Sequence, residues 1–158
     1  MIFAQSMRAE GAVQIIVVTD EPDKYERVQL PDGVGVQHRD ELDRIQREFR
    51  EIKGIMDQYE DFKINLWCFD TAIYNHQEFT QDNSEELFEY EPEGGGGTDF
   101  DAHWEYMKNY DINPKKFIMF TDGYPCGSWG DEEYCDSLFI VHGNETIVSP
   151  FGQTAYYK

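Results

Sequence analysis

The side chains best suited to bind a ligand in this 158-residue chain come at the ends of short apolar segments. Asp20 closes the run QIIVVTD, Asp70 follows INLWCF, and Asp122 and His142 follow FIMFT and LFIV. A further stretch, EPEGGGGTDFD, places Thr98 directly after four glycines. A Gly run either serves as a flexible linker or lets the backbone pass close to a ligand, so the groups around it decide its meaning.

Two kinds of catalytic chemistry can be weighed against these residues. A zinc peptidase needs two His on one helix face with a Glu between them, and the sequence has no HExxH. We therefore interpret His76, His103 and His142 as surface or loop residues. Nucleophilic catalysis needs a Ser or Cys beside a base, and Cys126 in GYPCGSWGDEEYCD is interpreted as a loop thiol without that role. We expect no enzymatic activity.

Short strands alternating with amphipathic helices must position these groups. Leu42, Ile45, Phe49, Ile52 and Met56 recur every three or four residues, which predicts a helix that Asp40 could cap. Runs of apolar and β-branched residues predict the strands. The predicted strands cover 13–18, 62–69, 117–120 and 137–141, and the predicted helices start at 40 and cover 99–110.

Two regions do not follow the alternation of strands and helices, and for one of them the sequence allows two structures. Segments 74–79 and 86–90 predict either two short edge strands or one helical turn capped by Ser84. The C-terminal stretch TIVSPFGQTAYYK predicts a hairpin-like segment. The alternation elsewhere predicts an α/β fold with a mainly parallel sheet covered by helices on both faces. Ligands in such folds bind beyond the carboxyl ends of the strands, so the polar groups named above should share one rim.

The composition favours one acidic domain over residues 1–158. The chain has 13 Lys and Arg against 32 Asp and Glu, a formal charge of -19, which repels a phosphate backbone. There is no apolar run long enough for a membrane span and no secretory signal pattern. The three cysteines lack zinc-ligand spacing and are read as reduced thiols. We expect a cytoplasmic protein.

The motifs GGGGTDFD and FIMFTDGYP together resemble the von Willebrand factor A (VWA) fold and its metal-ion-dependent adhesion site. With EIKGIM in the helix and a strand ending in CFD, the chain is similar to the bacterial and phage VWA-like domain that is often found beside a predicted metallopeptidase region. The resemblance covers residues 40–148 and leaves 1–39 as an atypical N-terminal segment. It implies a Rossmann-like three-layer sandwich.

The resemblance also implies a set of metal ligands. In the family, an Asp-x-Ser-x-Ser turn, a Thr and a further Asp surround Mg²⁺ or another divalent cation, which prefers oxygen ligands and keeps several waters. The matching motifs make Thr98 and Asp122 two of these ligands. No Asp-x-Ser-x-Ser occurs in this sequence. Asp20 and Asp32 are the candidate replacements from the first loop, and binding is expected to be weak or absent because both serine hydroxyls are missing.

Aromatic residues after Asp122 suggest a partner surface. Tyr124, Trp129 and Tyr134 lie in a polar, Gly-bearing segment, and exposed Tyr and Trp are favoured anchors in protein interfaces. The same rings could instead fold back over the end of the sheet.

The sequence therefore favours a non-enzymatic VWA-like domain that binds a protein partner through its loop rim, with a divalent cation assisting if carboxylates replace the serines. Two alternatives stay open. One is an accessory module of a metal-dependent hydrolase or peptidase, and the other is an acidic phage-type inhibitor that mimics nucleic acid.

Overall fold

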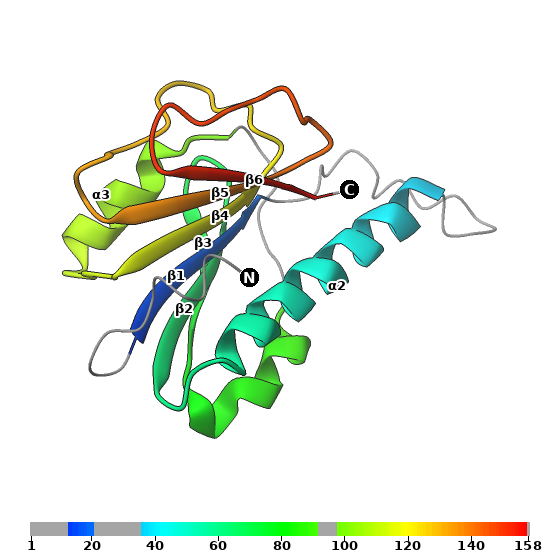
Figure 1. Ribbon diagram of the computed structural model, residues 1–158, viewed down its shortest axis with the longest axis vertical. Helices are drawn as coiled ribbons and strands as arrows, with labels where there is room; N and C mark the ends of the chain where they lie inside the picture. The colour runs from blue at the N-terminus through cyan, green and yellow to red at the C-terminus, as the bar shows by residue number, and fades with distance from the viewer. Residues whose placement is uncertain (1–12, 21–35, 92–97, 158) are drawn as a thin grey trace.

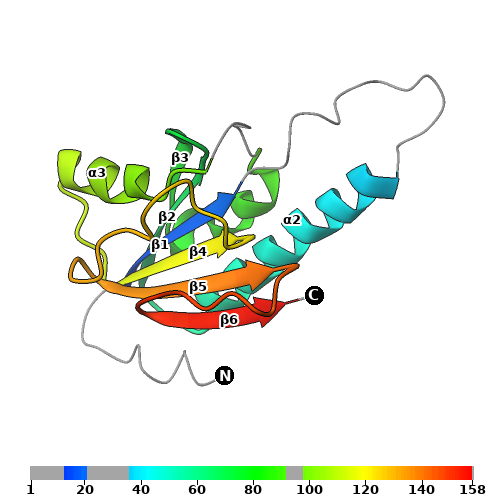
Figure 2. The same ribbon diagram turned by 90° about the horizontal axis from the view of Figure 1, so that it is seen from above.

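The structure, a computed structural model, describes residues 13–20, 36–91 and 98–157, with side chains over 46–91 and 98–156. Its strands form one six-stranded sheet in the order β3-β2-β1-β4-β5-β6. The strands are β1 (Val13–Asp20), β2 (Phe62–Phe69), β3 (Ile73–Phe79), β4 (Lys116–Thr121), β5 (Asp136–His142) and β6 (Gln153–Tyr157). All neighbours are parallel except β3, which pairs antiparallel with β2. In Figure 2 the arrows of β1, β4, β5 and β6 point the same way.

Helices flank both faces of this sheet, as the sequence predicts (Figure 1). The face with helix α2 (Val36–Met56) and the 3-10 helix η2 (Gln81–Glu89) encloses a core cluster that includes Ile52, Leu66 and Phe120. The other face carries α3 (Asp101–Asn109) and encloses Trp67, Trp104 and Phe117. Seven of the eight β2 residues are buried, as expected for a central strand covered on both faces. The three-layer α/β sandwich is confirmed.

The structure shows which of the two predicted alternatives the region after β2 adopts. Residues 73–79 form the edge strand β3, whereas 86–90 belong to η2 and its end. Thr80, not Ser84, is the N-cap: its hydroxyl accepts a hydrogen bond from the Asp82 amide at 3.4 Å. Asn83 returns the contact by accepting from the Thr80 amide at 2.8 Å. This reciprocal capping satisfies two amides that a helix start leaves open.

Two expectations are wrong. Helix α2 begins at Val36, so Asp40 lies within the helix and does not cap it. The C-terminal segment is not a hairpin: β6 runs parallel to β5, with Phe139 opposite Thr154. A parallel strand requires the chain to cross back over the sheet, and Phe151 in that connection packs on the α3 side of the core. Over the described residues, none of the helices is long and apolar enough to cross a membrane.

Candidate functional site

The candidate site is the edge of the sheet where the parallel strands end, called here the carboxyl edge; the opposite edge is the amino edge. The chain order reverses at β1, whose neighbours are β2 and β4. Asp20 is opposite Phe69 of β2, and Thr19 is opposite Phe120 of β4. The backbones at Asp20, Asp70 and Asp122 therefore follow adjacent strand ends at the topological switch point, where open α/β sheets bind ligands.

The turn after β4 fixes Asp122 at this edge. Thr121 is fully buried, and its hydroxyl accepts a hydrogen bond from the Gly123 amide at 3.1 Å. The half-buried Asp122 accepts from the Tyr124 amide at 3.0 Å through Oδ1. Gly123 has φ +84°, and a Cβ there would lie 2.9 Å from Ile147 Cγ2. Each residue of the motif Thr-Asp-Gly thus has its own role. The buried Thr121 hydroxyl closes the turn, Asp122 places a carboxylate at the edge, and Gly123 fits where a side chain would clash.

Thr98 lies between the ends of β2 and β4. The next residue, Asp99, donates its amide to the Asp70 carbonyl at 2.8 Å. On the other side, the Cys126 amide donates to the Thr98 carbonyl at 2.7 Å, and the Thr98 amide donates to Cys126 Sγ at 3.3 Å. The Thr98 segment is therefore joined to the loop that carries Asp122. The sequence prediction that these two segments share one edge of the sheet agrees with this backbone arrangement.

The Asp70 carboxylate shapes the turn on which Asp99 docks. It is 7% exposed and accepts hydrogen bonds from the amides of Thr71 and Ala72, the latter at 3.0 Å. Another hydrogen bond joins the loop after β4 to the start of α3: the Ser128 hydroxyl donates to Asp101 Oδ1 at 2.6 Å. These contacts hold the three loops of the edge in fixed relation.

The donor chemistry of this edge suits a hard cation only in part. Thr98 and Asp122 offer a hydroxyl and a carboxylate, which are oxygen ligands of the kind that Mg²⁺ takes. Among the described residues, no group of three or more His, Cys, Asp or Glu side chains could hold a metal ion. Asp20 is placed by its backbone alone, and Asp32 lies outside the described residues. A cation here would depend on one first-loop carboxylate and on water.

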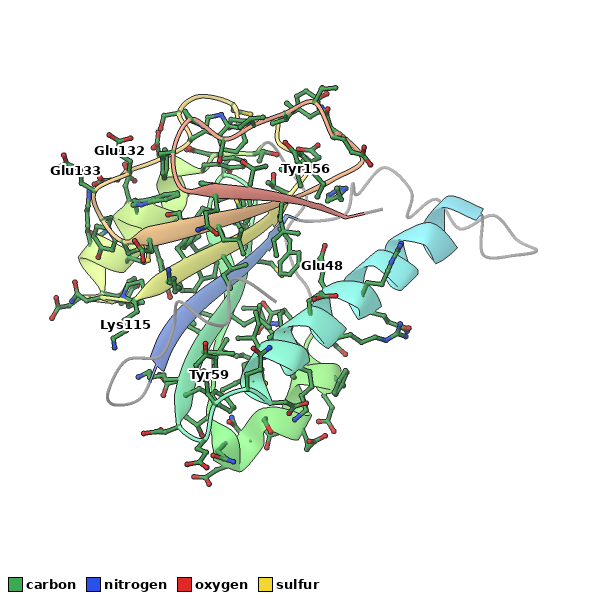
Figure 3. All side chains as sticks on the ribbon, viewed as in Figure 1. Glu48, Tyr59, Lys115, Glu132, Glu133 and Tyr156 are labelled. Carbon is green, nitrogen blue, oxygen red and sulfur yellow. The ribbon has the colours of Figure 1, made fainter. Side chains whose placement is uncertain are left out.

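The three aromatic residues proposed for partner binding do not share one rim. Tyr124 is at the carboxyl edge and 60% exposed. Trp129 packs against the α3-side core, with its ring centroid 5.1 Å from that of Phe139. Tyr134 is at the amino edge, where its hydroxyl donates to the Ile112 carbonyl at 2.8 Å. The prediction that the three rings share one rim was wrong, because a loop that joins two parallel strands must return from the carboxyl edge to the amino edge. Figure 3 shows Glu132 and Glu133, the neighbours of Tyr134 in sequence, at the amino edge.

His103 is also not a surface residue. It is fully buried on α3, and its Nδ1 accepts a hydrogen bond from Trp67 Nε1 at 3.0 Å. The Phe69 ring lies with its centroid 4.1 Å away. Burial lowers the pKa of His103 to about 3, so the ring stays neutral. The helical period could have signalled this, because His103 lies three residues after Phe100 and four before Met107, which are both on the apolar stripe.

His76 lies on the edge strand β3 and joins three elements. Its Nε2 contacts Asn65 Oδ1 at 2.8 Å, and its Nδ1 contacts the Tyr106 hydroxyl at 2.8 Å. Desolvation lowers the pKa of His76, against an opposing effect of Glu78. These contacts give the imidazole a structural role between the sheet and α3.

Cysteine reactivity should separate the three free thiols. Cys126 is exposed, Cys68 is buried and Cys135 is half-buried. Desolvation, with smaller contributions from Asp136 and Asp131, raises the pKa of the Cys135 thiol to about 11. Because the thiolate is the reactive form, we expect iodoacetamide at neutral pH to modify Cys126 at least about tenfold faster than the other two. Peptide mapping by mass spectrometry measures this, and faster labelling of Cys135 would contradict the arrangement.

The comparisons with known proteins agree with this architecture. The sequence profile of the VWA-like domain (DUF2201) matches residues 28–157. The match includes Asp32 and starts eight residues beyond Asp20, so it leaves out β1. No curated protein matches the chain.

Solved structures show the same fold at low sequence identity. The conserved hypothetical protein BatB from Bacteroides thetaiotaomicron has a TM-score of 0.60 at 12% identity, covering 93% of this chain and 91% of that one. An aerotolerance-related membrane protein from Bacteroides fragilis has a TM-score of 0.50 at 14% identity, covering 82% and 67%. Proximal thread matrix protein 1 from the mussel byssus has a TM-score of 0.56 at 16% identity, covering 92% of this chain but 42% of that one.

These likenesses establish the VWA-like fold, and the profile match spans most of the chain, from residue 28 to the end of β6. The chain belongs to the VWA-like domain (DUF2201) family.

Proposed function

We propose that this chain is a non-enzymatic protein-interaction domain that binds its partner at the carboxyl edge. The observation that carries the proposal is the pair of hydrogen bonds between Thr98 and Cys126, which join the Thr98 loop to the loop of Asp122 at the switch point. VWA-like domains often mediate protein interactions. A surface whose loops are already fixed loses little conformational entropy on binding.

Other features support binding rather than catalysis. The buried His103 serves as an acceptor for Trp67, and the raised pKa of Cys135 makes it a poor nucleophile at neutral pH. A charge of -19 opposes nucleic acid as the partner. Free thiols at Cys68, Cys126 and Cys135 fit a reducing compartment, so we place the protein in the cytoplasm.

Affinity capture with matched variants tests the proposal. The chain carrying Thr98→Ala and Asp122→Asn should lose a partner that the unmodified chain captures from a lysate of its own source. The chain carrying Glu132→Gln and Glu133→Gln removes two carboxylates from the amino edge and should retain that partner. Thermal unfolding of each variant shows that it is folded. Failure to find any protein that depends on Thr98 and Asp122 would contradict the proposal.

The same edge is proposed to hold a divalent cation weakly. Thr98 and Asp122 would supply two ligands, and Asp20 or Asp32 would replace the missing serines. The register places Asp20 beside β2 and β4, whereas the family match includes Asp32 and omits Asp20.

Magnesium should therefore stabilise the fold only slightly. A ligand at 100 times its dissociation constant adds about 2.7 kcal/mol to the free energy of unfolding. We expect millimolar Mg²⁺ to add much less, apart from a general effect of screening the negative surface. Thermal unfolding with and without Mg²⁺ measures the change.

Variants distinguish stabilisation by Mg²⁺ bound at the site from stabilisation by general screening of the negative surface. Asp122→Asn should remove any site-specific increase and leave the screening intact, while Glu132→Gln should leave both. Asp20→Asn and Asp32→Asn show which carboxylate takes part. A large increase that Asp122→Asn eliminates would mean that a complete ligand set exists.

A further inference from the structure

Exposed apolar side chains gather beside the candidate site. Five large hydrophobic residues are exposed in the described part of the chain, and three of them come from β6 and the loops that follow β4 and β5. They are Tyr124, Val148 and Tyr156, exposed by 60%, 70% and 40%, and are called here the apolar patch. Figure 3 shows Tyr156 at the end of the sheet opposite Glu132, Glu133 and Lys115. An exposed apolar cluster of this kind marks an interaction surface.

Hydrogen bonds hold the patch together. Asn144 Nδ2 donates to the Tyr124 hydroxyl at 2.5 Å, and the Tyr156 hydroxyl donates to the Ile147 carbonyl at 2.6 Å. Ile147 in turn lies against Gly123, where a Cβ would come within 2.9 Å of it. The segment 144–148 thus contacts both Tyr124 and Tyr156. Binding to such a prearranged surface needs little further ordering of its side chains.

The charge around the patch selects its occupant. Residues 117–158 contain six carboxylates and a single Lys or Arg, Lys158. Two of the six pair with lysines at the amino edge: Asp131 with Lys108 at 2.9 Å and Asp136 with Lys116 at 2.7 Å. Asp122 and Glu145 lie in the loops that form the patch. Asp122 accepts a hydrogen bond from the Tyr124 amide, and Glu145 follows Asn144, which donates to the Tyr124 hydroxyl. Opposite charges across an interface steer association and exclude partners of the wrong sign.

We infer that the apolar patch binds a polypeptide segment of the partner that carries Arg or Lys next to aliphatic or aromatic residues. The apolar side chains lie on Tyr124, Val148 and Tyr156, and the cations face Asp122 and Glu145 or the tyrosine rings. A second copy of this chain is a poor occupant because each copy carries a charge of -19. The inference rests on the proposed function and names the chemistry of its partner.

Selection from a phage-displayed library of random linear peptides tests the inference without assuming a sequence. The full chain, immobilised at physiological salt, should enrich peptides that combine net positive charge with aliphatic or aromatic residues. Enrichment of neutral or acidic peptides, or no enrichment, overturns the inference. Affinities of the selected peptides are then measured by titration with a fluorescent label.

Three variants locate the binding. Tyr124→Ser with Val148→Ser should weaken the selected peptides by about tenfold or more, as loss of central apolar anchors does. Phe88→Ser with Tyr110→Ser removes the exposed aromatic residues that lie elsewhere and should change affinity by less than about twofold. Glu145→Gln should weaken binding, and the difference should shrink at high salt. Circular dichroism confirms that each variant is folded.

The outcomes distinguish this inference from the proposed function. If peptide binding survives Tyr124→Ser with Val148→Ser but is lost with Thr98→Ala and Asp122→Asn, the carboxyl edge binds proteins and the apolar patch does not. If binding is lost only with the amino-edge variants Glu132→Gln and Glu133→Gln, both are wrong.

Discussion

Replacing Gly130 by alanine is expected to lower the free energy of unfolding by about 3 kcal/mol or more, the largest single effect that the structure indicates. Gly130 has φ +109°, a conformation that a residue with a side chain rarely adopts. A Cβ would also lie 2.5 Å from Trp104 Cζ3. Trp104 cannot move away easily, since it is 2% exposed and its ring centroid lies 4.7 Å from that of Phe117. Chemical denaturation measures the loss.

Gly127 provides the matched control in the same loop. A Cβ there would meet nothing within 4 Å, and its backbone is not in the positive-φ region. Gly127→Ala should therefore change the free energy of unfolding by no more than about 0.5 kcal/mol. Equal losses at the two positions would show that Gly130 does not lie against Trp104.

Acid should destabilise the protein through His103 by about 2 kcal/mol at about pH 5. The pKa of His103 falls from 6.5 to about 3 because burial disfavours the charged ring. Between these values the unfolded chain binds a proton that the folded chain does not. The contribution of His103 is therefore favourable above about pH 6.5 and is lost progressively as the pH falls toward 3. His76, whose pKa is also lowered, acts in the same direction.

The variant His103→Gln isolates this effect. Glutamine keeps an oxygen that can accept from Trp67 Nε1 but does not titrate, so the variant starts less stable and loses less on acidification. The quantity to compare is the slope of the free energy of unfolding between about pH 7 and about pH 5. The slope of the unmodified chain should be the steeper of the two. Identical slopes would contradict the buried, neutral imidazole.

Much of the fold could be predicted because its central strands are mostly apolar. The β2 residues Phe62–Phe69 are bounded by polar residues, and the prediction has the same ends as the strand. The predicted strand 117–120 lies within β4, which extends one residue further at each end, to Lys116 and Thr121. The parallel arrangement followed from the helices between these strands, since a helical crossover brings the next strand in parallel.

The elements that were missed depend on contacts distant in sequence. The stretch before β6 has turn residues typical of a hairpin, but Phe151 packs on Trp104 and Phe139 and so leads the chain across the sheet. His103 was assigned to the surface because polar residues usually lie there, yet Trp67 supplies a buried donor for it from another element. Neither partner can be identified from local sequence.

The candidate site was predictable in part for the same reason. The strand ends and the Thr-Asp-Gly turn placed Asp122 at the carboxyl edge, and the Gly run placed Thr98 near it. The return path of the loop after β4 could not be predicted, so Tyr134 was assigned to the wrong edge. The segment 144–148, which completes the apolar patch, has no motif of its own and is recognised only from its contacts with Tyr124 and Tyr156.

Hydrogen–deuterium exchange of the chain with and without its captured partner tests most directly the claim that the carboxyl edge is the binding surface. The partner should slow exchange in segments 98–101, 122–126 and 144–148, which meet at that edge. Segments 108–116 and 131–136, at the amino edge, should exchange as in the free chain. Protection confined to the amino edge or to α2 would contradict the account.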